Sequence, residues 1–246
     1  ADVTVYGFVA KPPARDADTF PKASAAVGRD FVDDAAVSGV VVNEGVAVER
    51  IVRLPAANVH AEFYLPTHAP IVGNVAALVP HKGQQHLIDA AALVVREVPD
   101  ARFVIVGDGE LRESLEKHIQ DRHLERHVFL AGFRMDALEF TKGFDLFAMS
   151  SVSEGMCTAL VDAMAASKAA VATAVGGVPE VVVDRETGFL VPAHDPKAMA
   201  DRLVEPKLQR WQRLARAVVV RRFQLAERHR RYCVRCGGRV QRCLGL

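Results

Sequence analysis

The sequence predicts an α/β protein built on a doubly wound parallel sheet, a Rossmann-like fold, and three observations support this class. First, short apolar runs of strand length alternate with amphipathic stretches of helix length between residues 71 and 192. Second, glycine and polar residues follow several of these runs, as at Gly107–Gly109 and Gly132-Phe133. Third, the connections are long enough for one helix each, which is typical of parallel strands joined by right-handed crossovers.

The individual elements follow from the spacing of the apolar residues. We expect strands over residues 71–78, 102–106, 128–130, 145–149 and 170–174, and a last strand that ends near residue 192. We expect helices over residues 82–98, 111–121 and 136–143, and two short helices further on. The first short helix follows Gly155, with Ser151 or Ser153 as its cap, and the second has Pro179 in its first turn. The apolar face of the first short helix consists of Leu160, Val161, Met164 and Ala165.

Composition and charge limit the class of protein. Of the 246 residues, 50% are hydrophobic and 25% are charged, which is typical of a globular protein with a sizeable core. The net charge of +1 gives no sign of nucleic-acid binding, and no apolar run is long enough to cross a membrane. The N-terminus lacks a secretory signal and the four cysteines are unevenly spaced, so we expect a cytoplasmic protein without a disulfide framework. The chain starts with Ala1 rather than Met, which is typical of an excerpt or a processed chain.

The composition changes along the chain, and these changes predict three regions. Residues 1–67 include a Pro-rich, polar stretch and only scattered strand patterns, so we interpret them as a truncated N-terminal region and linker. Residues 68–204 carry the alternating pattern and form the expected Rossmann-like domain. Residues 205–246 form an Arg- and Cys-rich tail. Its CVRCGG segment resembles half of a zinc knuckle, but a second pair of ligands is missing, so we expect no metal site there.

The stretch from residue 145 to residue 192 holds the side chains that are best placed for chemistry. Glu154 lies just before a predicted helix, and the N–H groups of residues 155–157 should point out of the open end of that helix. Such an end attracts anions and hydroxyl-rich ligands. Asp162 lies about two turns further along and offers a second carboxylate at the same mouth. The alternative interpretation is that Glu154 only favours the helix dipole and that Asp162 is a solvated surface residue.

The segment SEGMCTALVDAMA, followed by VATAVGGVPEVVVDRETGFLVP, resembles the donor-site signature of family 4 retaining glycosyltransferases. These are two-domain enzymes of the GT-B fold, and the resemblance covers residues 68–204, the nucleotide-sugar-binding half. It implies that Glu154 and the backbone after it hold the hydroxyls of the donor sugar. The residues of that backbone are Gly155, Met156 and Cys157. The resemblance also implies that Asp162, at a position where the family usually has Glu, holds the ribose.

The segment VPHKGQQHLIDAA resembles the loop that binds the donor diphosphate in the same family. The family places an Arg and a Lys beside the phosphates; Lys82 matches the Lys, whereas Ala77 stands in place of the Arg. A cation at the start of a helix opposes the helix dipole, which favours a ligand-directed role for Lys82 over that of a solvated lysine. The resemblance also implies that the turn at Gly132-Phe133 lies beside the nucleotide base.

The resemblance therefore implies an enzyme that transfers a sugar, with retention, from a nucleotide diphosphate sugar to the hydroxyl of a sugar or lipid-linked acceptor. Glu154 and Lys82 are the expected catalytic residues. No cofactor and no metal are expected, because a cation and helix N-termini can stabilise the leaving charge. A location in the cytoplasm, with contact to the inner face of the membrane, is compatible with such acceptors, and no nucleic-acid partner is expected. In this family the acceptor groups come from an N-terminal domain, which residues 1–70 are too few to supply.

Three other functions stay open. A nucleotide-sugar epimerase or a phosphorylase would be a different enzyme of related fold. The chain could instead be a non-catalytic module that binds nucleotide sugars, or a truncated chain that needs a separate acceptor domain. The third alternative is nucleic-acid binding through the Arg-rich tail.

Two further sets of side chains suggest chemistry of their own. Cys157 lies near a predicted helix N-terminus, where the pKa of a thiol is lowered, so a reactive thiol is one hypothesis. In the resembling family only the backbone of this position is used. His118, His123 and His127 are of the right type for metal binding, but their spacing does not repeat one helix face, so we expect no metal there.

Overall fold

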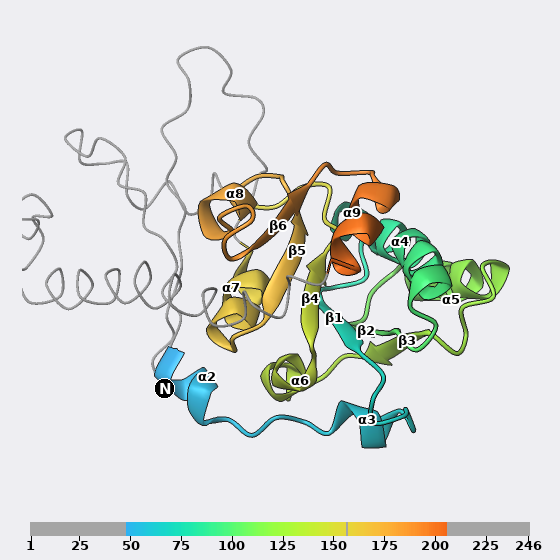
Figure 1. Ribbon diagram of the computed structural model, residues 1–246, viewed down its shortest axis with the longest axis horizontal. Helices are drawn as coiled ribbons and strands as arrows, with labels where there is room; N and C mark the ends of the chain where they lie inside the picture. The colour runs from blue at the N-terminus through green and yellow to red at the C-terminus, as the bar shows by residue number, and fades with distance from the viewer. Residues whose placement is uncertain (1–47, 156, 206–246) are drawn as a thin grey trace, which may run out of the picture. The chain divides into compact units, whose positions relative to one another are not determined.

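Six parallel strands form the centre of the fold in the computed structural model, which describes residues 48–155 and 157–205 (Figure 1). The strands are β1 (Ile71–Val75), β2 (Arg102–Val106), β3 (Val128–Gly132), β4 (Leu146–Met149), β5 (Ala169–Thr173) and β6 (Gly188–Val191). Their order is β3-β2-β1-β4-β5-β6, and each neighbouring pair is parallel. The order reverses between β1 and β4, so the sheet is doubly wound and the predicted fold class is confirmed.

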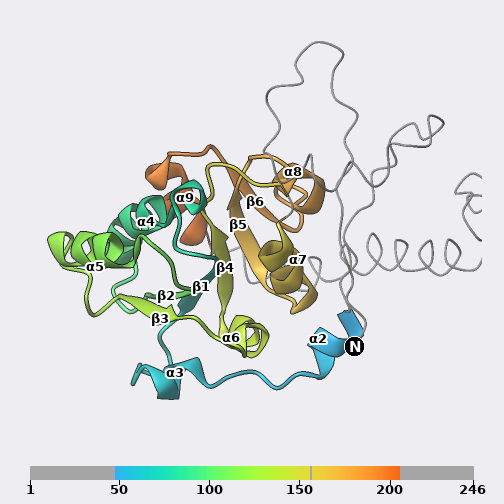
Figure 2. The same cartoon turned by 180° about the vertical axis from the view of Figure 1, so that it is seen from behind.

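Helices cover both faces of this sheet. They are α2 (Val48–Arg53), α3 (Val59–Glu62), α4 (Gln84–Glu97), α5 (Arg112–Asp121), α6 (Ala137–Gly143), α7 (Thr158–Ala165), α8 (Val178–Val181) and α9 (Pro196–Leu203), with a 3₁₀ turn η1 (Pro80–Lys82) before α4. Figures 1 and 2 show α4, α5 and α9 on one face and α6 and α7 on the other. Within these layers α4 packs beside α9 and α5, and α6 packs beside α7.

The hydrophobic core lies between these helices and the strands that they pack against. Every residue of β5 is buried, as expected for a strand that is covered on both faces. From α4, Leu87, Ile88 and Val94 are buried against the sheet. The predicted apolar face of α7 is confirmed, because its four members are all buried. Each large apolar side chain removed from water in this way contributes about 1.5–3 kcal/mol.

Two boundaries differ from the prediction near the end of β1. The strand ends at Val75 rather than residue 78 because the chain then turns across the end of β2, where the Leu78 N–H donates to the Asp108 carbonyl. Helix α4 begins at Gln84 because Gly83 adopts the left-handed conformation, with φ of 61°, and separates the helix from η1.

Helix α9 was not predicted, although its sequence carries signals for a helix start. Asp195 accepts a hydrogen bond from the Ala198 N–H at 2.8 Å, and Pro196 occupies the first turn. An Asp followed by Pro at the end of a strand therefore could have revealed this helix.

The predicted cap of α7 is wrong. The helix begins at Thr158, and its N-cap residue is Cys157, which makes no side-chain capping bond. The Ser151 hydroxyl donates instead to the Glu154 carboxylate at 2.6 Å. A cap preference is a local effect of about 1 kcal/mol, and a charge-assisted hydrogen bond is of at least that size.

Helices α2 and α3 precede the predicted domain boundary at residue 68 and contact the sheet domain. Lys142 of α6 donates to carbonyl oxygens at the end of α2, those of Ile51, Val52 and Leu54. The Phe63 ring, just after α3, packs against Phe129 of β3 and Phe140 of α6. The three predicted regions stay a prediction, since residues 1–47 and the Arg- and Cys-rich tail from residue 206 lie outside the described part of the chain. Among the helices that are described, none has the length and apolar character needed to cross a membrane.

Candidate functional site

The candidate site lies at the carboxyl ends of β1 and β4, where the strand order reverses. Two loops meet there, η1 after β1 and the loop between β4 and α7. The Val152 N–H donates to the His81 carbonyl at 2.8 Å, and the Ser150 hydroxyl donates to the Lys82 carbonyl at 3.2 Å. A Cβ on Gly83 would lie 2.4 Å from the Ser150 carbonyl oxygen, so this close approach requires glycine. The two loops therefore form one unit.

Lys82 and Glu154 form an ion pair at the centre of this unit. The Lys82 Nζ lies 2.7 Å and 3.0 Å from the two carboxylate oxygens of Glu154, which is 72 residues away in the sequence. The Glu154 side chain is only 3% exposed, and that of Lys82 is 22% exposed. Ser151 donates to the same carboxylate, and the Ser151 carbonyl accepts from the buried Thr173 hydroxyl. The structure thus brings the two predicted catalytic residues into direct contact.

The Gly-Gly turn after β5 supports the backbone of Glu154. A Cβ on Gly176 would lie 1.7 Å from the Glu154 carbonyl oxygen, and one on Gly177 would lie 2.7 Å from the Gly155 carbonyl oxygen. Gly176 also has φ of +50°, which favours glycine. On the other side, a Cβ on Gly155 would meet nothing within 4 Å. Gly176 and Gly177 therefore form a floor under Glu154, which sequence reasoning missed.

Asp162 is the second predicted carboxylate, and it lies on α7. Because α7 begins at Thr158, Asp162 is about one turn from the helix start, closer to the mouth than its spacing from Glu154 indicated. The residue is half-buried, and its backbone carbonyl accepts from the Ala166 N–H. Its role toward a ribose stays a prediction.

Gly132 ends β3 and Phe133 follows it, two strands from β1 on the side away from β4. The Gly132 carbonyl accepts from the Gly107 N–H at 2.8 Å, which joins the ends of β2 and β3. Phe133 is 72% exposed, so its ring presents an open aromatic surface at the same sheet edge. The next residue, Arg134, is held between Glu62 and Asp136 at 2.5 Å and 2.8 Å. This clamp fixes the loop that carries Phe133.

Residues 57–212, more than half of the chain, match the family described as "Glycosyl transferases group 1". The chain belongs to this family. Among curated relatives, the chain is 32% identical to poly(ribitol-phosphate) alpha-N-acetylglucosaminyltransferase of Staphylococcus aureus. The aligned stretch has 136 residues, which are 55% of this chain and 28% of that protein. The chain is also 32% identical over 133 residues to UDP-Gal:alpha-D-GlcNAc-diphosphoundecaprenol alpha-1,3-galactosyltransferase of Escherichia coli, 53% of this chain and 34% of that protein.

Solved structures share the fold of this chain, among them a domain of a group 1 glycosyltransferase family protein. HepE of Anabaena, solved in complex with UDP-glucose, has a TM-score of 0.69 and 26% identity, and the match covers 84% of this chain and 60% of that chain. The C-terminal domain of LpcC, a group 1 family protein of Francisella tularensis, has a TM-score of 0.64 and 25% identity, with 73% of this chain and 98% of that domain covered. The predicted resemblance is therefore confirmed at the level of family and fold. The chain spans about a third of the length of the curated relatives named above.

Ala77 occupies the turn where an arginine was expected from the resemblance. The residue is exposed, and its carbonyl accepts from the Gln84 side-chain amide at 2.8 Å. Gln84 itself is 1% exposed, so it ties the start of α4 firmly to this turn. The turn between β1 and α4 consequently carries a single permanent cation, Lys82.

The hypothesis of a reactive Cys157 is contradicted by its surroundings. The residue is 4% exposed, and burial raises the pKa of its thiol from 9.0 to about 11. A backbone hydrogen bond and the nearby Lys82 lower the pKa, while the Glu154 carboxylate raises it further, and burial prevails. Met156, which was predicted to offer its backbone beside Cys157, lies outside the described residues.

We expect Cys157 to react slowly with iodoacetamide at pH 8 in the folded protein. The shift of its pKa by two pH units leaves roughly a hundredfold less thiolate than an ordinary cysteine has, and only the thiolate attacks. Mass spectrometry of the peptide that contains Cys157 would follow the labelling, with protein in denaturant as the control. Equal rates in native and denatured protein would contradict the buried position.

The histidines considered for metal binding have separate partners. His118 contacts the Asp89 carboxylate at 2.8 Å, and His127 contacts the Ala101 carbonyl at 3.2 Å. His123 is exposed. Within residues 48–155 and 157–205, no three potential metal-binding side chains of the His, Cys, Asp and Glu types lie close enough to share an ion. The expectation that the site uses no metal stays a prediction.

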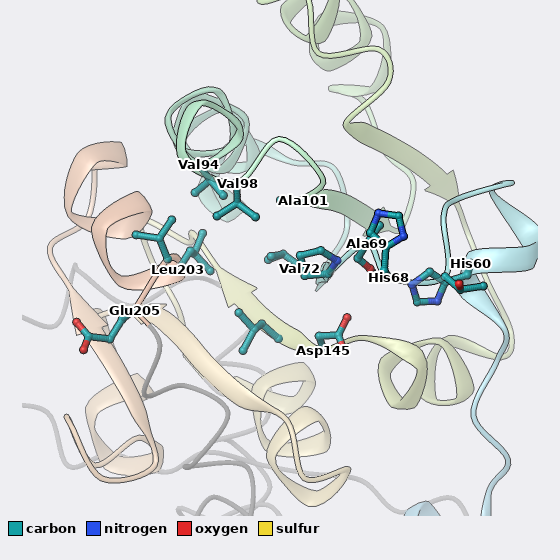
Figure 3. Close-up of a pocket in the computed structure, with 14 residues that line it drawn as sticks. His60, His68, Ala69, Val72, Val94, Val98, Ala101, Asp145, Leu203 and Glu205 are labelled. Carbon is teal, nitrogen blue, oxygen red and sulfur yellow. Dashed lines mark hydrogen bonds between the residues drawn. The ribbon is translucent and has the colours of Figure 1, made fainter.

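A cavity of about 490 Å³ lies at the other edge of the sheet (Figure 3). Asp145 and Val72, at the amino ends of β4 and β1, line it together with Val94 of α4 and Val98, which caps the end of that helix. Leu203 closes it from α9. None of the predicted site residues lines this cavity, because they stand at the carboxyl ends of the strands.

Proposed function

We propose that this chain is the donor-binding half of a retaining glycosyltransferase, which transfers a sugar from a nucleotide diphosphate sugar to an acceptor hydroxyl. The observation that carries the proposal is the Lys82–Glu154 pair, which lies where the order of the parallel strands reverses and has a buried carboxylate. Ligands of doubly wound sheets bind at this switch point. Since every relative named above is a glycosyltransferase, a transferase is favoured over a non-catalytic module.

Lys82 is proposed to stabilise the departing diphosphate. An ammonium group has three N–H donors, so Lys82 can contact a phosphoryl oxygen and keep a bond to Glu154. The N-terminus of α4 follows directly after Gly83 and adds the positive end of a 14-residue helix. Groups that are in place before the charge develops lower the barrier, because they need no reorganisation during the reaction. No cofactor is needed in this proposal, since the donor carries its own leaving group.

Glu154 and the N–H of Gly155 are proposed to orient the donor sugar. Asp162 is proposed to orient the ribose of the nucleotide. The floor of Gly176 and Gly177 holds the Glu154 backbone, and Lys82 and Ser151 hold its carboxylate, so this acceptor is preorganised. The two relatives named above form alpha linkages by their names, and retention from an alpha-linked donor gives such products.

The acceptor is proposed to be a sugar or a lipid-linked sugar, in the cytoplasm or at the inner face of the membrane. Catalysis requires that donor and acceptor are held together, an effect worth up to about 7–11 kcal/mol. We therefore expect transfer, and with it turnover, to require acceptor groups beside the donor wall described here. The release of nucleotide diphosphate in the presence of mixed acceptors measures this turnover.

The test of the proposed function separates the two carboxylates by ligand. In calorimetry, Glu154→Gln should weaken binding of the nucleotide sugar and leave binding of the bare nucleotide diphosphate largely unchanged. Asp162→Asn should weaken both ligands, because both contain ribose. A charge-assisted hydrogen bond of about 1.5–3 kcal/mol corresponds to roughly a ten- to hundredfold loss of affinity.

The wild-type chain provides the reference for this test. It should bind at least one of the UDP-, GDP- and ADP-sugars, as judged first by a thermal-shift screen. No binding to any of the three would contradict the proposed function. The reverse pattern in the variants would exchange the roles of Glu154 and Asp162.

A further inference from the structure

Arg112 is the first residue of α5 and presents a cation at the open end of this helix. A cation at the start of a helix is opposed by the helix dipole. Its guanidinium is nevertheless held in one orientation, with Nε 3.0 Å from Glu116 and Nη1 3.9 Å from Asp108. The side chain is 37% exposed, so solvent and ligands can reach it.

The held guanidinium faces the open space beside Gly132. A Cβ on Gly132 would meet one group within 4 Å apart from its chain neighbours, and that group is Nη1 of Arg112 at 3.7 Å. The Gly132 carbonyl is bonded to Gly107, which closes the floor between β2 and β3. The exposed ring of Phe133 follows immediately. A flat ligand group at this place would meet the Arg112 guanidinium, and the next residue along the chain offers an exposed aromatic ring.

The position of this space along the sheet indicates which part of the donor it takes, and this step rests on the proposed function. Glu154 follows β4, Lys82 follows β1, and Gly132 ends β3. From β4 to β3 there are three strand spacings of about 4.8 Å each, or about 14 Å. In a nucleotide sugar the sugar and the base lie at opposite ends of the diphosphate and ribose. With the sugar at Glu154 and the diphosphate at Lys82, the base reaches the space between Arg112 and Phe133.

We propose that Arg112 reads the base of the donor nucleotide and selects a base with a carbonyl edge, uracil or guanine, over adenine. A guanidinium has only donors, so it requires acceptors on the base. Uracil offers carbonyl oxygens, and guanine offers a carbonyl oxygen beside a ring nitrogen, the usual partner of arginine. Adenine carries an amino group at the corresponding position, so two hydrogen-bond donors would face each other there. The Phe133 ring supplies stacking, which every base can accept because each has a π-face.

The test measures the affinities of UDP, GDP and ADP by calorimetry for wild type, Arg112→Gln and Arg112→Ala. Wild type should bind UDP or GDP at least tenfold more tightly than ADP. Arg112→Ala should lose about 5- to 150-fold for the preferred nucleotide and little for ADP, the range expected for a bidentate contact. Arg112→Gln should shift the ranking toward ADP, because a glutamine amide pairs with the adenine edge. The matched control is Arg126→Ala, which removes an exposed arginine that precedes β3, at the opposite end of the strand from Gly132, and should keep the wild-type ranking.

The outcomes distinguish this inference from the proposed function. An equal loss for all three nucleotides in both Arg112 variants, or an unchanged ranking, would overturn base reading by Arg112 while nucleotide binding stands. A wild-type preference for ADP would overturn it as well. If wild type binds none of the three nucleotides, the proposed function fails, and this inference fails with it. Thermal unfolding of each variant shows whether the fold is kept, and Arg112→Gln serves as the second variant should Arg112→Ala unfold.

Discussion

Replacing Lys82 by alanine is expected to lower the free energy of unfolding by about 3 kcal/mol and to weaken nucleotide diphosphate binding more than nucleoside binding. The Glu154 carboxylate is 3% exposed and would lose its cation. Removal of one partner from a buried ion pair costs about 3–5 kcal/mol of stability. Because Lys82 is partly exposed, we expect a cost at the lower end of this range. Urea unfolding and calorimetry with both ligands would measure the two effects.

A double-mutant cycle provides the control for this prediction. Lys82→Met combined with Glu154→Gln should cost clearly less than the sum of the two single changes, because the double variant leaves no buried charge without a partner. Additive costs would contradict the coupling between the two side chains. Equal losses of nucleoside and nucleotide diphosphate affinity in Lys82→Ala would remove Lys82 from its role beside the phosphates.

Replacing Gly176 by alanine is expected to destabilise the protein by about 3 kcal/mol and to abolish recognition of the donor sugar. The left-handed backbone, with φ of +50°, costs about 1–2 kcal/mol for a residue with a Cβ. Overpacking adds about 1–3 kcal/mol, because the new Cβ would lie 1.7 Å from the Glu154 carbonyl oxygen. Relief of this clash moves the backbone of Glu154 and Gly155, which is proposed to hold the sugar. Urea unfolding and calorimetry with a nucleotide sugar would measure both effects.

Gly155→Ala is the matched control for stability, since it adds the same methyl group one loop away. Its Cβ would meet nothing within 4 Å, so the free energy of unfolding should stay within about 0.5 kcal/mol of wild type. If Gly176→Ala proved as stable as Gly155→Ala, the floor under Glu154 would be refuted.

The sequence by itself determined the order of the elements and the edge of the sheet at which the candidate site lies. Strand and helix periodicity is local information, and β2 was predicted with its observed bounds, residues 102–106. The connection lengths then implied parallel strands, and parallel strands bring their carboxyl ends to one edge. This reasoning was enough to place Lys82, Gly132 and Glu154 at the same edge before any contact was known.

Only the tertiary structure decided which groups touch and which are buried. The pairing of Lys82 with Glu154 depends on β1 lying beside β4, and the support from Gly176 depends on β5 lying beside β4. Burial raised the pKa of Cys157, whereas its position near a helix start predicted the reverse. In the same way, Ser151 turned to the Glu154 carboxylate instead of capping α7. Local patterns failed at these points because packing of the whole domain sets the distances between segments that are far apart in the sequence. The same packing decides how much of each side chain loses contact with solvent.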